Sequence, residues 1–169
     1  MAITASDIKF YLSGGGSNSD VNAALGGAIS STEVTSASLH NLFDKVSGAE
    51  ASAGDTEYRC IYVKNTHGSL TWESVKAWVS TNTPSTDSTI DIALGGEGKN
   101  GTAETVANEN TAPSGESFSA PSSYASGLSL GDLDAGDYYP IWIRRTISAS
   151  ATAYNTDGAT ISVQGDTAA

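Results

Sequence analysis

The segment from residue 133 to residue 143 reads Leu133-Asp134-Ala135-Gly136-Asp137-Tyr138-Tyr139-Pro140-Ile141-Trp142-Ile143. Its first half is rich in Asp and Gly, which favour a turn, and its second half is rich in aromatic and β-branched residues, which favour a strand. Pro140 has no backbone N–H to donate, so it indicates a sheet edge or a bulge at that point. The segment therefore predicts a tight turn followed by a strand.

The spacing of Leu133, Gly136 and Tyr139, three residues apart, resembles the tyrosine corner of immunoglobulin-like and fibronectin-type-III-like sandwiches. In that motif the tyrosine hydroxyl donates a hydrogen bond to backbone a few residues upstream. The resemblance implies that Tyr139 is the corner residue, that Leu133 and Gly136 are structural, and that the fold is a Greek-key β-sandwich of this kind or a jelly roll.

Similar runs elsewhere predict more strands, at residues 8–12, 57–63, 70–80, 90–94, 102–107 and 159–164. We expect residues 57–63 and 70–80 to form one hairpin, and residues 90–94 and 102–107 to form another through Asn100-Gly101. Residues 40–46 have helical spacing and are expected to form one or two helical turns that Gly48 ends. Because no linker or repeat divides the chain, residues 1–169 are predicted to be a single all-β sandwich domain.

Residues 13–38 lack a regular pattern. They begin with Gly14-Gly15-Gly16 and continue with isolated apolar residues among Gly, Ala and Ser. We expect an extended N-terminal arm or loop within the domain. The arm is also expected to be dispensable for folding but needed for binding neighbouring subunits, so that deletion of residues 1–35 should leave a folded domain that no longer binds them.

Charge limits the classes of partner. The 169 residues include 8 Lys and Arg against 19 Asp and Glu, a formal net charge of −11. Such a chain repels nucleic acid and anionic membranes, so neither is expected as a partner. The first residues hold only a short apolar stretch, so we expect no secretory signal and predict folding in the cytoplasm. Cys60 lies in an apolar run and is expected to be buried and inert.

Three short motifs match catalytic or ligand-binding patterns without the required context. Residues 127–131 (GLSLG) match the nucleophile elbow, but a turn follows Ser129 where the elbow needs a helix. Gly96, Gly98 and Gly101 match a dinucleotide fingerprint with no helix of sufficient length after it. Residues 155–158 (NTDG) resemble part of a calcium loop without its later glutamate. We therefore predict no catalytic, cofactor-binding or metal-binding residues, no cofactor, and no enzymatic activity.

Large aromatic and guanidinium side chains near the predicted strand ends are candidates for an interface. Trp, Tyr and Arg dominate binding hot spots because they bury a large area and still form hydrogen bonds. A tryptophan can equally fill the core, and for Trp142 both readings stay open. The arginines are expected to pair with carboxylates of a neighbouring subunit or with Asp132, Asp134 and Asp137 of the same chain. The candidates are Trp72, Trp78, Tyr138, Trp142, Arg144 and Arg145.

Three longer phrases carry a second resemblance. They are EYRCIYVKN at residues 57–65, GTAETVANENTAPSG at residues 101–115 and GDYYPIWIRR at residues 136–145. These phrases resemble virion structural proteins of tailed bacteriophages. The resemblance implies a sandwich bound in many copies to a phage particle, and it supplies no catalytic residue. The best-fitting place is the outer surface of the head, as a decoration or cement protein that binds the major capsid protein or other virion proteins as a homo-oligomer.

Other functions stay open at this point. A neck, collar or tail-associated protein would use the same sandwich in a ring of fewer copies. A carbohydrate-binding module for host attachment would place Trp72 or Trp78 exposed on a flat face. A serine hydrolase would need Ser129 to react with a fluorophosphonate, and we expect no such labelling.

Overall fold

Strands β2 (Asp55–Asn65) and β6 (Tyr138–Ile147) form the centre of the larger sheet in the computed structural model, which describes residues 2–167. They pair antiparallel from Asp55 opposite Ile147 to Lys64 opposite Tyr138. Strand β1 (Ile8–Leu12) pairs with the other side of β2, and β4 (Ser88–Leu94) pairs with the other side of β6. The order of this sheet is therefore β1-β2-β6-β4.

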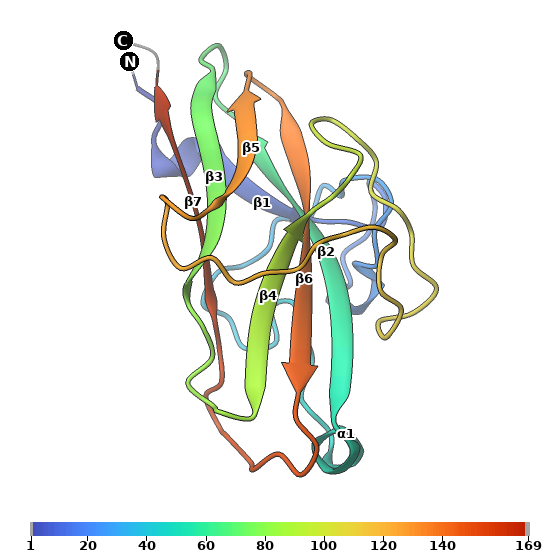
Figure 1. Ribbon diagram of the computed structural model, residues 1–169. Helices are drawn as coiled ribbons and strands as arrows, with labels where there is room; N and C mark the ends of the chain where they lie inside the picture. Colours follow the sequence, from blue (N-terminus) through green and yellow to red (C-terminus); the bar gives the residue numbers. More distant parts are fainter. Residues whose placement is uncertain (1, 168–169) are drawn as a thin grey trace.

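The smaller sheet packs face to face on the larger one (Figure 1). Its central strand β3 (Trp72–Thr81) pairs antiparallel with β5 (Leu128–Leu133) and with β7 (Thr160–Thr167). Two antiparallel sheets confirm the predicted all-β sandwich, whereas its Greek-key connection stays a prediction. Helical structure is limited to η1 (Ala5–Asp7), η2 (Val21–Ala23) and α1 (Gly48–Ala53) within the described residues. No helix there is long and apolar enough to cross a membrane.

The main core lies between the two sheets, where alternate residues of each strand point inward. Strand β2 contributes Ile61 and Val63, and β6 contributes Ile141 and Ile143. The smaller sheet meets them with buried side chains that include Trp72, Val75, Ala77, Val79, Leu130 and Leu133. The burial of these residues is the main source of the fold's stability.

A second core covers the outer face of the larger sheet. Cys60, Tyr62 and Trp142 alternate with the inward residues of β2 and β6, so they point away from the smaller sheet. Loops cover them with apolar side chains, namely Leu25, Ile29, Ala103, Val106 and Phe118. The larger sheet is thus buried on both faces, which explains the nearly continuous apolar run in β2.

Residues 13–38 follow the surface of the domain instead of leaving it. The Val34 N–H donates to the Phe10 carbonyl at 2.8 Å, and the Ser30 N–H donates to the Leu12 carbonyl at 2.8 Å, so this segment runs back along β1. Gly27 forms a bridge with Ala103. Deletion of residues 1–35 would remove β1 and uncover the second core, so we no longer expect the remaining chain to fold.

Both predicted hairpins are wrong. Strands β2 and β3 lie in opposite sheets, and the segment 66–71 crosses from one sheet to the other. Residues 102–107 do not return beside β4, since their one bridge joins Ala103 to Gly27. A strand's own residues indicate that it is a strand, but they do not say which strand it pairs with.

The predicted helix is displaced. Residues 40–46 form an irregular loop, and α1 begins at Gly48, the residue that was expected to end a helix. The Ser47 hydroxyl accepts from the Glu50 N–H at 3.3 Å, while the Glu50 carboxylate accepts from the Ser47 N–H at 2.6 Å. This capping box fixes the start of the helix.

Pro140 lies in the inner strand β6 opposite Tyr62, and the register with β2 is unbroken there, so the prediction of an edge or a bulge is wrong. Its carbonyl accepts from the Gly95 N–H at 2.9 Å, immediately after β4 ends at Leu94. The ring nitrogen faces the same side as this carbonyl, where the regular pairing with β4 has ended. The missing donor therefore interrupts no ladder.

The tyrosine-corner bond is not formed. Among residues 2–167 the Tyr139 hydroxyl has no hydrogen-bond partner. The turn is held by the Asp137 carboxylate, which accepts from the Asp134 N–H at 2.9 Å and from Asn100 Nδ2 at 2.6 Å. Gly136 has a φ of +91° in this turn, and Leu133 is fully buried in the main core.

Candidate functional site

The structure removes two tryptophans from the interface candidates. Trp72 lies in the main core and Trp142 in the second core, and they are 4% and 0% exposed. Of the two interpretations of Trp142, the structure supports the one in which its side chain fills the core. Its indole N–H has no hydrogen-bond partner among the described residues.

Tyr138 and Arg144 lie at the margin of the second core and are half-buried. The Tyr138 ring packs edge to face on Tyr62, with centroids 5.5 Å apart. Arg144 Nη2 donates to the Asp91 carboxylate at 2.8 Å, and the guanidinium lies 4.9 Å from the centroid of the Phe118 ring. These contacts hold β4 and the loop around Phe118 against β6.

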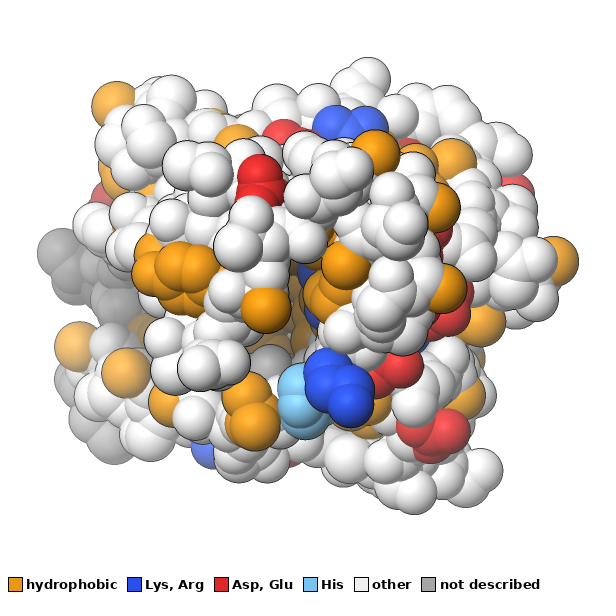
Figure 2. Space-filling view, turned by 90° about the horizontal axis from the view of Figure 1, so that it is seen from below, with side chains coloured by type: hydrophobic (Ala, Val, Ile, Leu, Met, Phe, Trp, Pro, Cys, Tyr) orange, Lys and Arg blue, Asp and Glu red, His pale blue; other side chains and the backbone are white. Residues whose placement is uncertain are grey.

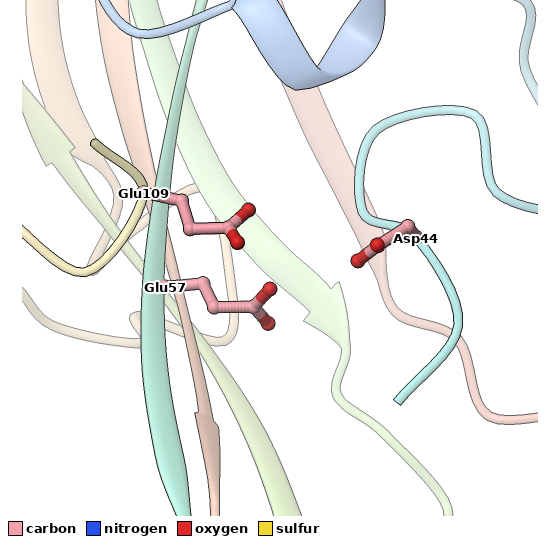
Figure 3. A group of neighbouring side chains, drawn as sticks. All are labelled: Asp44, Glu57 and Glu109. Atoms are coloured by element: carbon pink, nitrogen blue, oxygen red, sulfur yellow. The ribbon is translucent and has the colours of Figure 1, made fainter. Parts of the chain in front are cut away.

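Arg145 belongs to a cluster of charged side chains near the start of β2, and Figure 3 shows the three carboxylates of this cluster. The cluster consists of Asp44, Glu57, Arg59, Glu109 and Arg145. Arg145 Nε donates to Glu57 Oε2 at 2.5 Å, and Arg145 Nη1 donates to the Asp44 carbonyl at 2.8 Å. Arg59 Nη2 donates to Glu109 Oε2 at 2.5 Å. Arg145 thus pairs with carboxylates of its own chain, but not with Asp132, Asp134 or Asp137 as predicted.

Burial has the largest effect on the pKa of Glu57, one of the two deeply buried residues of the cluster. Glu57 and Arg59 are 1% and 0% exposed. Desolvation raises the pKa of Glu57 although the Arg145 charge opposes the shift. The Phe43 ring lies beside both cations, 5.5 Å from the Arg59 guanidinium and 4.8 Å from that of Arg145. The cluster holds the loops around Phe43 and Glu109 against the first half of β2.

The three carboxylates of the cluster could also be read as a metal site. Oxygens of Asp44, Glu57 and Glu109 lie within 4.8 Å of one another and converge from three segments (Figure 3). The two guanidiniums already pair with these three carboxylates, and a cation bound among them would meet repulsion from both positive charges. The residues therefore fit an ion-pair network and do not fit a metal ion.

Asn65 is a structural residue that no sequence motif singled out. It is fully buried at the end of β2, and its Nδ2 donates to the carbonyls of Leu70 and Leu133, both at 2.9 Å. Its Oδ1 accepts from the His67 N–H at 3.0 Å, and its own carbonyl accepts from Gly136. Asn65 thereby links the crossing segment to the turn before β6. In the sequence, the only indication of this role was that Asn65 stands at the end of a long apolar strand.

The residues of the catalytic-looking motifs lie in strands and turns. Ser129 lies within β5 opposite Lys76, and the strand continues after it to Leu133. Gly98 and Gly101 belong to the turn after β4, where the Gly101 N–H donates to the Gly98 carbonyl at 3.0 Å. The Asp157 carboxylate accepts from the Ser85 N–H at 3.2 Å and from the Ser88 hydroxyl, which ties its loop to the start of β4.

Trp78 lies on the outer face of the smaller sheet and is half-buried. The Tyr124 ring meets it at 82°, with the centroids 6.0 Å apart. Lys76 Nζ lies 5.1 Å from the centroid of Tyr124, and the Tyr124 hydroxyl donates to the Ser74 carbonyl at 2.9 Å. Of the predicted interface residues, Trp78 is the one that lies on the outer face of the smaller sheet.

Comparisons with protein-family models, with curated proteins and with solved structures found no match for this chain. Evidence for its function therefore comes from the residues themselves.

Proposed function

We propose that this chain is a structural protein of a tailed-bacteriophage particle, a sandwich subunit that decorates the outer face of the head and stabilises it. Its partner is the major capsid protein, and it is present on the particle in many copies. The proposal rests on the resemblance of three sequence phrases to virion structural proteins and on where those phrases lie in the fold.

The observation that carries the proposal is that the three phrases are neighbours in space. Residues 57–65 are most of β2, and residues 136–145 include most of its partner β6. Residues 101–115 pack on this pair: the Ala103 N–H donates to the Tyr62 hydroxyl at 2.8 Å, and the Tyr58 N–H donates to the Glu109 carbonyl at 2.7 Å. The resemblance thus concerns one continuous framework, the central strands and their covering loop.

The charge of the chain suits the outer surface of a head full of DNA. Five of the eight Lys and Arg residues form ion pairs with carboxylates of the same chain, which leaves an excess of acidic groups. At the end of the molecule that carries α1, Figure 2 shows scattered hydrophobic and acidic side chains and a few basic ones among uncharged polar groups and backbone. The net acidic charge of the whole chain keeps a free subunit soluble and away from nucleic acid.

The contacts with neighbouring subunits are assigned to loop tips, since residues 13–38 are engaged with β1 and the second core. Leu39 is 76% exposed and is the most exposed large apolar side chain among residues 2–167. We expect Leu39→Asp to reduce the amount of chain on particles without changing its free energy of unfolding, because nothing in the subunit covers this side chain.

Quantitative mass spectrometry of purified particles tests the proposal. A decoration protein is expected at on the order of hundreds of copies per particle, whereas a neck or tail ring holds about a dozen or fewer. A ratio near that of the major capsid protein supports decoration of the head. A count of about a dozen assigns the chain to the neck or tail, and its absence from particles refutes the proposal.

A further inference from the structure

The outer face of the smaller sheet differs from that of the larger sheet. Cys60, Tyr62 and Trp142 on the outer face of the larger sheet are fully buried beneath loops. On the smaller sheet, Ser129 of β5 and Gln164 of β7 are exposed. This face is therefore open to a ligand.

The register of the strands places polar side chains in rows across this face. Lys76 lies opposite Ser129 on one side and opposite Gln164 on the other. Trp78 lies opposite Ser162, whose hydroxyl is 2.8 Å from that of Ser80. Residues opposite one another in an antiparallel pair share a face, so hydroxyl, amide and ammonium groups surround the indole.

Two aromatic rings form a corner within these rows. Tyr124 comes from the segment before β5, and its ring stands at 82° to that of Trp78. The bond from its hydroxyl to the Ser74 carbonyl and the Lys76 ammonium beside its ring hold Tyr124 in place. A ring fixed in this way loses little conformational freedom when a ligand binds.

We propose that the outer face of β5-β3-β7 binds a neutral carbohydrate, with Trp78 and Tyr124 as the aromatic platform. A sugar ring presents C–H groups on its faces and hydroxyls around its edge. The C–H face matches an indole or phenol ring, and the hydroxyls match the side chains of Ser129, Ser162 and Gln164, which both donate and accept hydrogen bonds.

The charges at the end of this face exclude acidic sugars. Glu73 lies opposite Asp166, and the Asp132 carboxylate accepts from the Ser74 N–H at 2.8 Å. Lys76 is the one cation among the residues of the rows, and the whole chain carries a net charge of −11. An anionic glycan would meet repulsion from these carboxylates, so the ligand is a neutral hexose-containing glycan.

The test uses the full chain free in solution, so its outcome does not depend on the proposed place in a phage particle. The labelled chain is applied to a printed array of neutral and acidic oligosaccharides, and the neutral ones that bind are titrated by calorimetry. Trp78→Ala is expected to lower the affinity at least about tenfold, because a tryptophan at the centre of a binding surface dominates the binding energy. Gln164→Ala is expected to lower it about threefold through a lost hydrogen bond.

Tyr154→Ala is the matched control, because Tyr154 is an exposed aromatic residue in the loop after β6. It should bind as the wild type does. Gln164 lies outside both cores, so its variant tests the surface even if Trp78→Ala fails to fold. The proposal is wrong if the wild type binds no neutral oligosaccharide, or if folded variants at Trp78 and Gln164 bind as tightly as the wild type. Sedimentation that finds a dimer dissolved by Trp78→Ala would assign the face to a second copy and would also overturn it.

Discussion

Asn65 joins parts of the molecule that are far apart in sequence, and its replacement should be costly. In Asn65→Ala the buried carbonyl of Leu133 and the partly buried carbonyl of Leu70 lose their donor. We expect the free energy of unfolding to fall by about 2–4 kcal/mol, since each unsatisfied buried group costs about 1–3 kcal/mol. Urea denaturation measures the change.

Asn41→Ala is the control for this prediction. The Asn41 side chain makes a single exposed bond to the Thr35 carbonyl at 3.0 Å. Its replacement should change the free energy of unfolding by no more than about 0.5 kcal/mol. Equal effects of the two substitutions would contradict the role given to Asn65.

Asp137 makes the stability of the turn before β6 depend on pH. Partial burial raises its pKa, but hydrogen bonds from Asn100, the Asp134 N–H and Lys99 outweigh this and hold the pKa below its ordinary value of 3.8. A carboxyl with a lowered folded-state pKa contributes stability above about pH 4, and that contribution is lost as the pH falls through the folded-state pKa.

Asp137→Asn should therefore lower the free energy of unfolding by about 1 kcal/mol at neutral pH. The difference from the wild type should be constant above about pH 5 and should shrink below about pH 4. Urea denaturation from about pH 3 to about pH 7 gives both curves. A difference that grows as the pH falls would show that the carboxylate does not stabilise the turn.

At the scale of elements, the loops over the larger sheet meet at a point with no room for a side chain. Gly26 has a φ of +88°, and a Cβ placed there would lie 1.7 Å from the Glu104 carbonyl oxygen. Gly26→Ala should lower the free energy of unfolding by at least about 3 kcal/mol, because the two loops must separate. Thermal unfolding followed by circular dichroism measures it.

Gly158→Ala provides the comparison. A methyl group added at Gly158 would meet no atom within 4 Å, and the residue has no positive φ. Its replacement should therefore cost less than about 0.5 kcal/mol. If Gly26→Ala were equally mild, the two loops would not be packed as described.

The reactivity of the Cys60 thiol measures how well the loops cover the second core. Cys60 is fully buried, its N–H donates to the Ala24 carbonyl at 2.8 Å, and burial raises the pKa of the thiol. An aromatic disulfide reagent should therefore react slowly with the native chain and rapidly in urea. A chain that lacks residues 1–35 should react at nearly the unfolded rate. Slow reaction of that truncated chain would show that the arm is dispensable for folding after all.

Sequence patterns predicted where strands form better than they predicted which strands pair with one another. The aromatic and β-branched runs of β2 and β6 indicated both strands, because those preferences are local. The predicted hairpin between β2 and β3 was wrong because β2 pairs with β6, whose partner residues lie 74 (Lys64 to Tyr138) to 92 (Asp55 to Ile147) positions away in sequence. The helix was misplaced because the apolar spacing of residues 40–46 outweighed the capping box at Ser47.

For the whole molecule, the candidate sites were also hard to predict, because local sequence patterns do not show which distant segments meet in the fold. Trp78 was identified from its residue type, but Tyr124 was not, because only the folded chain brings the segment before β5 over β3. Trp72 and Trp142 could not be told from surface residues, since the pattern of a strand does not say which of its faces is covered. The charged cluster joins side chains from four segments of the chain, so no local motif indicated it.

The whole subunit has a larger sheet that is sealed by loops and a smaller sheet that presents an open face. Electron cryomicroscopy of an intact particle tests this arrangement and the proposed function together. We predict density for the sandwich in many copies on the outer surface of the head, with the face of β5-β3-β7 that carries Trp78 turned to solvent. Absence of the sandwich from the head surface would contradict the proposed role, and burial of that face against the shell would contradict the proposed carbohydrate site.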